Sequence, residues 1–150
     1  MLRDEPYDGP SAQALTAAVQ LEYVARYGSP DDGPLDAHEL VPPTGCFVVG
    51  YLDTTPVAMG GLRVHDERTV EIKRMFVVPE WRGRGLSRLV LARLEELGAQ
   101  MGASRLILET GLVQPEAMSL YETSGYTRIE SFGHYRDSPL SVCYGKTLRP

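Results

Sequence analysis

The segment Arg82-Gly83-Arg84-Gly85-Leu86-Ser87 carries the strongest chemical signal in the sequence. It follows an apolar run that ends at Val78 and precedes a helix-like run of regularly spaced leucines. A glycine turn at a helix start presents unpaired backbone N–H groups and the positive end of the helix dipole, and glycine lets an anion approach closely. Together with the arginine charges, this arrangement predicts a pyrophosphate-binding turn. On the local pattern alone, a flexible turn with solvated arginines is as well supported as a pyrophosphate-binding turn. The segment matches neither the Walker A pattern nor the dinucleotide glycine pattern.

Hydrophobic periodicity and turn-forming residues predict the elements that position this turn. The predicted strands are Leu2–Pro6, Cys46–Tyr51, Pro56–Val64, Thr69–Val78, Arg105–Glu109, Tyr126–Glu130 and Ser141–Lys146. The predicted helices are Ser11–Tyr27, Leu86–Met101 and Pro115–Ser124, with a short helical turn around Asp36–Leu40. Short polar gaps between the second, third and fourth strands indicate antiparallel hairpins. The order of the elements predicts an α+β, or mixed α/β, fold.

The composition is typical of one globular domain that covers residues 1–150. The formal net charge of -5 argues against a non-specific nucleic-acid binder, which needs a broad positive field. No apolar run is long enough for a membrane span or a secretory segment, so we expect a cytoplasmic protein without a membrane partner. Cys46 and Cys143 lie in apolar runs, and the three histidines lack metal-ligand spacing. This predicts buried thiols and no bound metal.

Three motifs resemble those of the GNAT superfamily of N-acetyltransferases. Arg82–Ser87 matches the acetyl-CoA signature Q/R-x-x-G-x-G/A, with Ser87 where glycine or alanine is usual. Arg74–Pro79 resembles the pantetheine-binding strand, and Leu120–Tyr126 is similar to the helix end L-Y-x-x-x-G-F/Y. The resemblance covers the chain from about Pro56 to Lys146. It implies a central, mostly antiparallel sheet of about seven strands flanked by about four helices in a single domain.

The same resemblance implies acetyl-CoA as a co-substrate. The cofactor-binding positions that it implies are Met75, Phe76, Val77, Arg82, Gly83, Arg84, Gly85, Leu86, Ser87, Gln114 and Tyr121. Gln114 stands where the family's N-x-x-A motif has asparagine. It either keeps an amide contact to the pantetheine or only precedes a helix, and the second interpretation is slightly favoured.

The implied reaction transfers an acetyl group from the CoA thioester to an amine, so the leaving thiolate needs a proton donor. Tyr121 matches the family's tyrosine, and a phenol with a pKa near ~10 is protonated at neutral pH and able to donate. We therefore expect Tyr121 to be the general acid. The alternative is a buried core aromatic on a helix face.

The amine must also lose a proton, and Glu71 lies where some family members carry a general-base glutamate. Strand alternation places Glu71, Lys73, Met75 and Val77 on one face, so an ion pair between Glu71 and Lys73 is nearly as well supported as catalysis. A water chain is a further alternative for the base. The resemblance implies that the backbone N–H of Val77 stabilises the oxyanion.

The leading interpretation is an acyltransferase that moves an acetyl group to a primary amine of a small molecule by direct attack in a ternary complex. Gly28–Gly45 and Phe132–Pro139 are expected to shape the acceptor site, and a homodimer stays open. The alternatives are a protein N-terminus or lysine acetyltransferase and a non-catalytic acyl-CoA-binding sensor or regulatory module. An ATP-binding domain is the weakest interpretation, because no acidic strand end accompanies the glycine turn.

Overall fold

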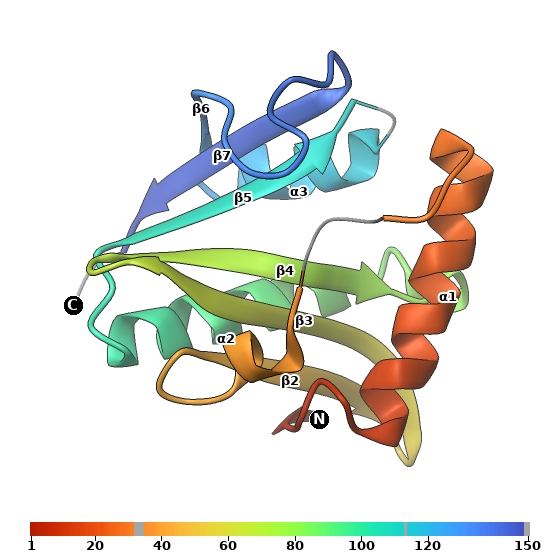
Figure 1. Cartoon of the computed structure of the whole chain (residues 1–150). Coiled ribbons are helices and arrows are strands. Elements are labelled where there is room, and N and C mark those ends of the chain that lie inside the picture. Colours follow the sequence, from red (N-terminus) through yellow and green to blue (C-terminus); the bar gives the residue numbers. More distant parts are fainter. Residues whose placement is uncertain (32–34, 113, 149–150) are drawn as a thin grey trace.

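The computed structural model describes residues 1–31, 35–112 and 114–148, which form one seven-stranded sheet in the order β1-β2-β3-β4-β5-β7-β6 (Figure 1). The strands are β1 (Leu2–Asp4), β2 (Gly45–Leu52), β3 (Thr55–Asp66), β4 (Thr69–Val77), β5 (Arg105–Gly111), β6 (Thr127–Ile129) and β7 (Ser141–Thr147). The helices are α1 (Pro10–Tyr27), α2 (Leu86–Gln100) and α3 (Pro115–Thr123), with short 3-10 helices η1 (Ala37–Leu40) and η2 (Pro79–Trp81).

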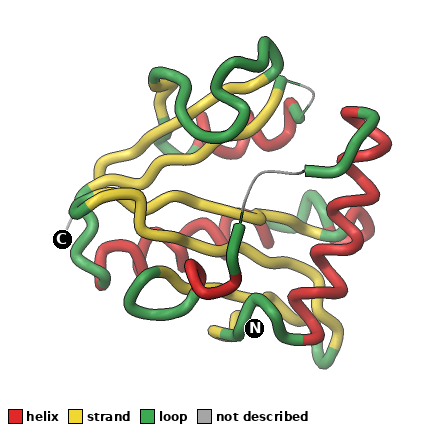
Figure 2. Tube along the Cα trace, viewed as in Figure 1, coloured by secondary structure: helices red, strands yellow, loops and turns green. Residues whose placement is uncertain are grey.

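The sheet is covered on both faces, with α1 on one side and α2 and α3 on the other (Figures 1 and 2). Alternation along the strands supplies both cores, because successive side chains point to opposite faces. Val48, Leu62 and Ile72 pack with α2 and α3, whereas Phe47, Met59 and Phe76 pack with α1. The fold is therefore a sandwich of one sheet between two helical layers.

The seven predicted strands are confirmed, and all adjacent pairs are antiparallel except β4 with β5. The structure has three α-helices in its described residues rather than about four, and the predicted turn around Asp36–Leu40 is the 3-10 helix η1. This turn stays short because Asp36 and Glu39 complete a capping box, while Val41 at its other end is already extended. The first and sixth strands are also shorter than predicted.

Strand β4 is bulged at Arg74, whose φ of 61° lies in the left-handed region. The register with β3 shifts opposite this residue, between Met59 and Gly61. A bulge adds one residue to a strand and reverses the alternation beyond it. Val77 therefore packs on the α2 side of the sheet, as Val70 does. Glu71 follows Val70 directly on the strand, so its side chain lies on the opposite, α1 side. The prediction that Glu71, Lys73, Met75 and Val77 share one face is wrong for this reason.

Strands β4 and β5 are parallel for only a short distance. Their pairing covers Thr69–Glu71 against Arg105–Ile107 and then ends. Because the remaining part of β5 pairs only with β7, the two central strands diverge toward their carboxyl ends. The carboxyl ends of neighbouring parallel strands are a common place for ligands in α/β folds.

In the described ranges, no helix combines the length and apolar character that a membrane crossing requires. The same ranges hold no group of three or more metal-ligating side chains. Cys46 and Cys143 are buried free thiols, as the sequence predicted. Burial raises the pKa of the Cys46 thiol to about 11, so this thiol is protonated at neutral pH.

Candidate active site

A first cavity of about 460 Å³ lies between the end of β4, the start of α2 and helix α3. All of the predicted cofactor residues except Arg84 line it, together with Val19 and Glu22 from α1 and Glu116 and Ala117 from α3. The sequence did not indicate the contribution of α1, because only the tertiary fold brings that helix to the end of β4. The structure thus gathers the three motifs around one space, although Leu120–Tyr126 is remote in the sequence from the other two.

The glycine turn at the mouth of this cavity is shaped for a close approach. Gly83 and Gly85 have φ values of 77° and 81°, and Gly85 is the N-cap of α2. No heavy atom would lie within 4 Å of a Cβ added at either position. Open space therefore lies beside the start of α2, where the first backbone N–H groups of a helix have no partner within it and commonly bind anions.

The side chains of Arg82 and Arg84 in the turn contact neighbouring protein groups. Arg82 Nη2 lies 2.8 Å from Glu22 Oε1, and its Nε donates to the carbonyl oxygen of Val77 at 2.9 Å. Arg84 stacks over Trp81, with 4.6 Å between the guanidinium carbon and the ring centroid. We infer that the backbone of the turn is the main anion-binding group, while Arg82 fixes its position against α1.

Tyr121 on α3 lines the first cavity and is 4% exposed. Its ring contacts two further tyrosines, with centroid distances of 5.6 Å to Tyr126 and 6.0 Å to Tyr144. Within the described part of the chain its hydroxyl has no hydrogen-bond partner. Burial raises the pKa of the Tyr121 phenol well above its ordinary value, and the nearby Tyr23 adds to this shift. The phenol is therefore a protonated donor at neutral pH with a free hydroxyl.

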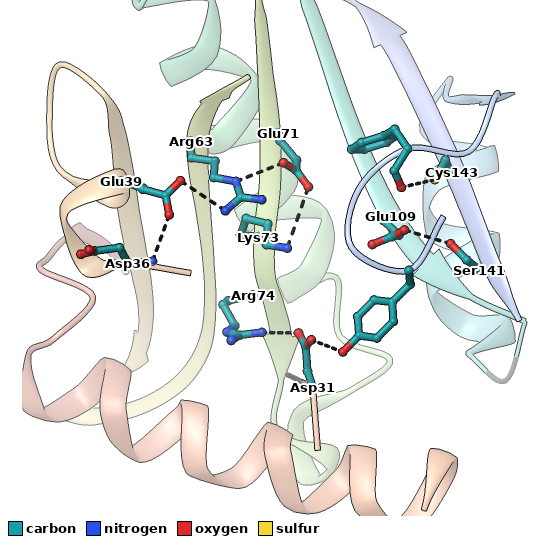
Figure 3. Close-up of polar contacts among 12 residues, drawn as sticks. Asp31, Asp36, Glu39, Arg63, Glu71, Lys73, Arg74, Glu109, Ser141 and Cys143 are labelled. Carbon is teal, nitrogen blue, oxygen red and sulfur yellow. Dashed lines mark hydrogen bonds and ion pairs between the residues drawn. The ribbon is translucent and has the colours of Figure 1, made fainter. Parts of the chain in front are cut away.

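A second cavity of about 280 Å³ opens where β4 and β5 diverge. Its polar wall includes Lys73 on β4 and Glu109 on β5 (Figure 3). The two segments predicted to shape an acceptor site contribute Ser29, Pro30 and Asp31, and Tyr135 and Ser138. Residues 32–34 of the first segment lie outside the described residues. The remaining lining residues include Tyr23, Tyr27, Thr110, Gly111, Gln114, Leu140 and Ser141.

Asp31 joins the two loops that border the second cavity. Its carboxylate pairs with Arg74 at the β4 bulge (Figure 3). It also accepts a hydrogen bond of 2.7 Å from the hydroxyl of Tyr135. Arg74 Nε also donates to the hydroxyl of Tyr7 at 3.2 Å. The strained conformation of Arg74 is thus held by contacts on the α1 side, and the cavity wall is fixed by an ion pair.

Glu71, the predicted base, is 3% exposed and lines neither cavity. Its Oε1 lies 3.1 Å from Nε of Arg63, and its Oε2 lies 3.9 Å from Nζ of Lys73 (Figure 3). Arg63 also pairs with Glu39 of η1 at 3.3 Å. The predicted contact with Lys73 is present, and the sequence did not indicate the closer contact with Arg63 on the neighbouring strand.

Gln114 connects the two cavities, because it is the one described residue that lines both. It occupies the N-cap position of α3 without a side-chain cap, and its Nε2 donates to the hydroxyl of Tyr27 at 2.9 Å. Both interpretations from the sequence are therefore compatible with its position. The two spaces meet beside Gln114, near the ends of β4 and β5.

The sequence and the fold were compared with known proteins. A sequence model of the Acetyltransferase (GNAT) family matches residues 12–126. The chain belongs to this family. This GNAT acetyltransferase is 36% identical over 115 residues to an IAA acetyltransferase from Azospirillum brasilense, covering 76% of this chain and 75% of that protein. It is 32% identical over 106 residues to N-acetylaspartate synthetase from Rattus norvegicus, covering 70% of this chain but only 36% of the synthetase.

Solved structures agree with the family assignment. A candidate acyl-CoA N-acyltransferase from Klebsiella pneumoniae superposes with a TM-score of 0.86 at 29% identity, covering 99% of this chain and 97% of that chain. A GNAT family acetyltransferase from Elizabethkingia anophelis, solved with acetyl-CoA bound, gives a TM-score of 0.72 at 14% identity, covering 99% and 97%. The second likeness shows the fold alone. The GNAT resemblance and the enzyme class predicted from the sequence are confirmed: this chain is an acyltransferase.

Proposed function

We propose that this GNAT acetyltransferase transfers an acetyl group from acetyl-CoA to a primary amine of a small molecule, by direct attack in a ternary complex. The observation that carries the proposal is the junction of two cavities at Gln114. One cavity is lined by the acetyl-CoA motif and the other by charged residues of opposite sign. A reaction between two bound substrates needs two spaces that meet at the reacting atoms.

In this proposal the pyrophosphate binds at the turn between Arg82 and Ser87, and the pantetheine runs along the end of β4. The backbone N–H of Val77 stabilises the oxyanion, and Tyr121 protonates the leaving thiolate. The acetyl-CoA in the Elizabethkingia anophelis relative supports the choice of co-substrate. A cytoplasmic location, a homodimer and the lack of nucleic-acid and membrane partners belong to the same proposal.

The acceptor is proposed from the size and charge of the second cavity. A volume of about 280 Å³ suits a molecule of amino-acid size better than a folded protein surface. Lys73 can bind a carboxylate of the acceptor, and Glu109 can bind its ammonium group. The name of the N-acetylaspartate synthetase relatives points to an amino acid acceptor with the same two charges. L-Aspartate is therefore the first acceptor to test.

The proposal predicts that acetyl-CoA raises the melting temperature of the purified chain and that CoA thiol is released when an acceptor is added. The panel should contain L-aspartate, L-tyrosine and tyramine, and mass spectrometry should identify the acetylated product. The pair L-tyrosine and tyramine shares an amine and differs in the carboxylate. Binding of acetyl-CoA without transfer to any of these amines would favour the sensor or regulatory module.

A second prediction concerns Glu71. Because its carboxylate is buried against Arg63, Glu71→Gln should lower the free energy of unfolding by about 1.5 to 3 kcal/mol, the usual value of a hydrogen bond to a charged group. If the contacts with Arg63 and Lys73 are its only role, turnover per folded molecule should persist. A large loss of turnover at an unchanged melting temperature would instead establish Glu71 as the base, and a pH–rate profile would then show the change at its acidic limb.

A further inference from the structure

We propose that Glu109, rather than Glu71, receives the ammonium group of the acceptor and takes its proton. This inference rests on the acetyltransferase function proposed above and assigns a residue that the sequence motifs did not indicate. It starts from the difference in placement between the two carboxylates.

Glu109 lies farther along the diverging strands than Glu71 does. Glu71 is opposite Ile107 in the last register pair of β4 with β5, and Glu109 follows two residues later on the same face of β5. At that point the strands no longer pair, and the side chain lines the second cavity while Glu71 does not. Glu109 therefore reaches the space where an acceptor would bind.

The contacts of the two carboxylates also differ. Glu71 is 3.1 Å from the guanidinium of Arg63. Glu109 Oε2 accepts a hydrogen bond of 3.0 Å from Oγ of Ser141, but none of the ion pairs in the described ranges involves Glu109 (Figure 3). A half-buried carboxylate without a direct cationic partner is costly. The ammonium group of an acceptor supplies the missing cation.

The β6–β7 loop closes over this carboxylate. A Cβ added at Gly133 would lie 3.2 Å from Oε1 and 3.4 Å from Oε2 of Glu109. Gly133 has a φ of 83°, a conformation that glycine adopts without strain. The close backbone restricts water on one side of Glu109 and leaves the cavity side for a ligand.

The electrostatic surroundings of Glu109 favour uptake of a proton by its carboxylate. Burial raises the pKa of Glu109 above its ordinary value, and Glu71 adds to the rise, while Ser141, Lys73 and a backbone N–H of Tyr135 oppose it. Further titratable groups near this carboxylate are Cys143 on β7 and the cavity residues Tyr23, Tyr27, Asp31 and Tyr135. Burial raises the pKa of the Cys143 thiol as well. A carboxylate with a raised pKa is a stronger base than an ordinary glutamate.

The proposed step conserves protons and electrons. Glu109 accepts one proton from the acceptor's ammonium group, and the nitrogen lone pair forms the C–N bond to the thioester carbonyl carbon. The tetrahedral intermediate loses its second nitrogen proton to solvent and expels the thiolate as the C–S bond breaks. Tyr121 gives the thiolate a proton and regains one from solvent, while Glu109 releases its proton on product departure. The net products are the acetylated amine, CoA thiol and one proton.

The test compares Glu109→Gln, Glu71→Gln and the control Glu67→Gln, which changes an exposed glutamate in the β3–β4 turn. With L-aspartate as the probe, Glu109→Gln should lower kcat by about 10²- to 10⁴-fold and leave the Kd of acetyl-CoA unchanged. The deficit should shrink as the pH approaches the pKa of the acceptor amine, because free amine then needs no base. L-Tyrosine and tyramine are measured in parallel, and the comparison uses whichever of the three the unmodified enzyme acetylates.

The melting temperature distinguishes the role of Glu109 from that of Glu71. A carboxyl whose folded pKa is raised stabilises the fold below its unfolded pKa, and this contribution is lost as the pH rises through the folded pKa. Glu109→Gln, which mimics the protonated form, should therefore melt at the same or a higher temperature at neutral pH. Glu71→Gln should melt lower.

The pH–rate profile of Ser141→Ala tests whether Glu109 is the base. Removing the hydrogen bond from Ser141 should raise the pKa of Glu109 further and move the acidic limb of the pH–rate profile to higher pH. The inference is overturned if Glu109→Gln keeps turnover within about threefold, or if Glu71→Gln alone loses turnover at an unchanged melting temperature. If the unmodified enzyme binds acetyl-CoA and acetylates none of the three amines, the proposed function fails and the inference fails with it.

Discussion

Replacing Tyr121 by phenylalanine is expected to lower the turnover number by roughly 10²- to 10⁴-fold, the usual effect of losing a general acid. The phenyl ring preserves the packing with Tyr126 and Tyr144. Because the hydroxyl has no protein partner in the described part of the chain, its removal should change stability little. The variant should fold and bind acetyl-CoA, and only the proton for the leaving thiolate is missing.

The pH dependence of this variant follows from the direction of the pKa shift. Burial raises the pKa of Tyr121 above that of an ordinary phenol, so the hydroxyl is protonated throughout the neutral range. The loss of turnover should therefore have the same size from weakly acidic to weakly basic pH. This distinguishes Tyr121 from a carboxylate base, whose loss is greatest at low pH.

Tyr144→Phe is the matched control. Tyr144 is fully buried in the same aromatic group, but its hydroxyl donates to Oε2 of Glu122 at 2.6 Å and it lines neither cavity. Loss of this hydroxyl should reduce the free energy of unfolding by about 1.5 to 3 kcal/mol and leave turnover per folded molecule intact. If Tyr121→Phe behaves in the same way, Tyr121 is a core aromatic and the sensor hypothesis regains support. Acetyl-CoA affinity, melting temperature and turnover decide between the two.

The fold was predictable because its signals are local. The β-rich apolar runs around Val48, Val57 and Leu106, and the turn-forming residues between such runs, placed seven strands within a few residues of their observed bounds. The exception is the Arg74 bulge. A positive φ at an arginine depends on contacts with Asp31 and Tyr7, which are remote in the sequence, so the pattern of alternating residues could not reveal it.

The two cavities of the site also differed in how well the sequence predicted them. The acetyl-CoA motif is contiguous, and the structure places it along one cavity. The second cavity is assembled from the loop after α1, the diverging strands and the β6–β7 loop, and no contiguous pattern describes it. One signal for Glu109 was available, because an acid that follows Leu106 and Leu108 in a buried strand is unusual. The sequence also did not indicate that the side chain of Arg82 contacts Glu22 of α1.

The acetyl-CoA proposal depends most directly on Gly85. Gly85→Val is expected to weaken acetyl-CoA binding by about 10- to 100-fold, which corresponds to losing one charge-assisted hydrogen bond of about 1.5 to 3 kcal/mol. The branched side chain occupies the open space in front of the α2 N-terminus. It also disfavours the left-handed conformation at this N-cap, so the backbone N–H groups that face the pyrophosphate would turn away.

Gly102→Val separates the effect on the ligand from the effect of backbone strain. Gly102 has a φ of 87°, and a Cβ added there would also meet no heavy atom within 4 Å, but it follows the end of α2 and lines neither cavity. Both variants should lose similar stability, because valine is strained in the left-handed region to the same degree. Calorimetric titration should show weaker acetyl-CoA binding for Gly85→Val alone, and the remaining affinity should depend less on salt. Equal affinity in the two variants would remove the pyrophosphate from this turn, because a ligand held there must meet the new side chain.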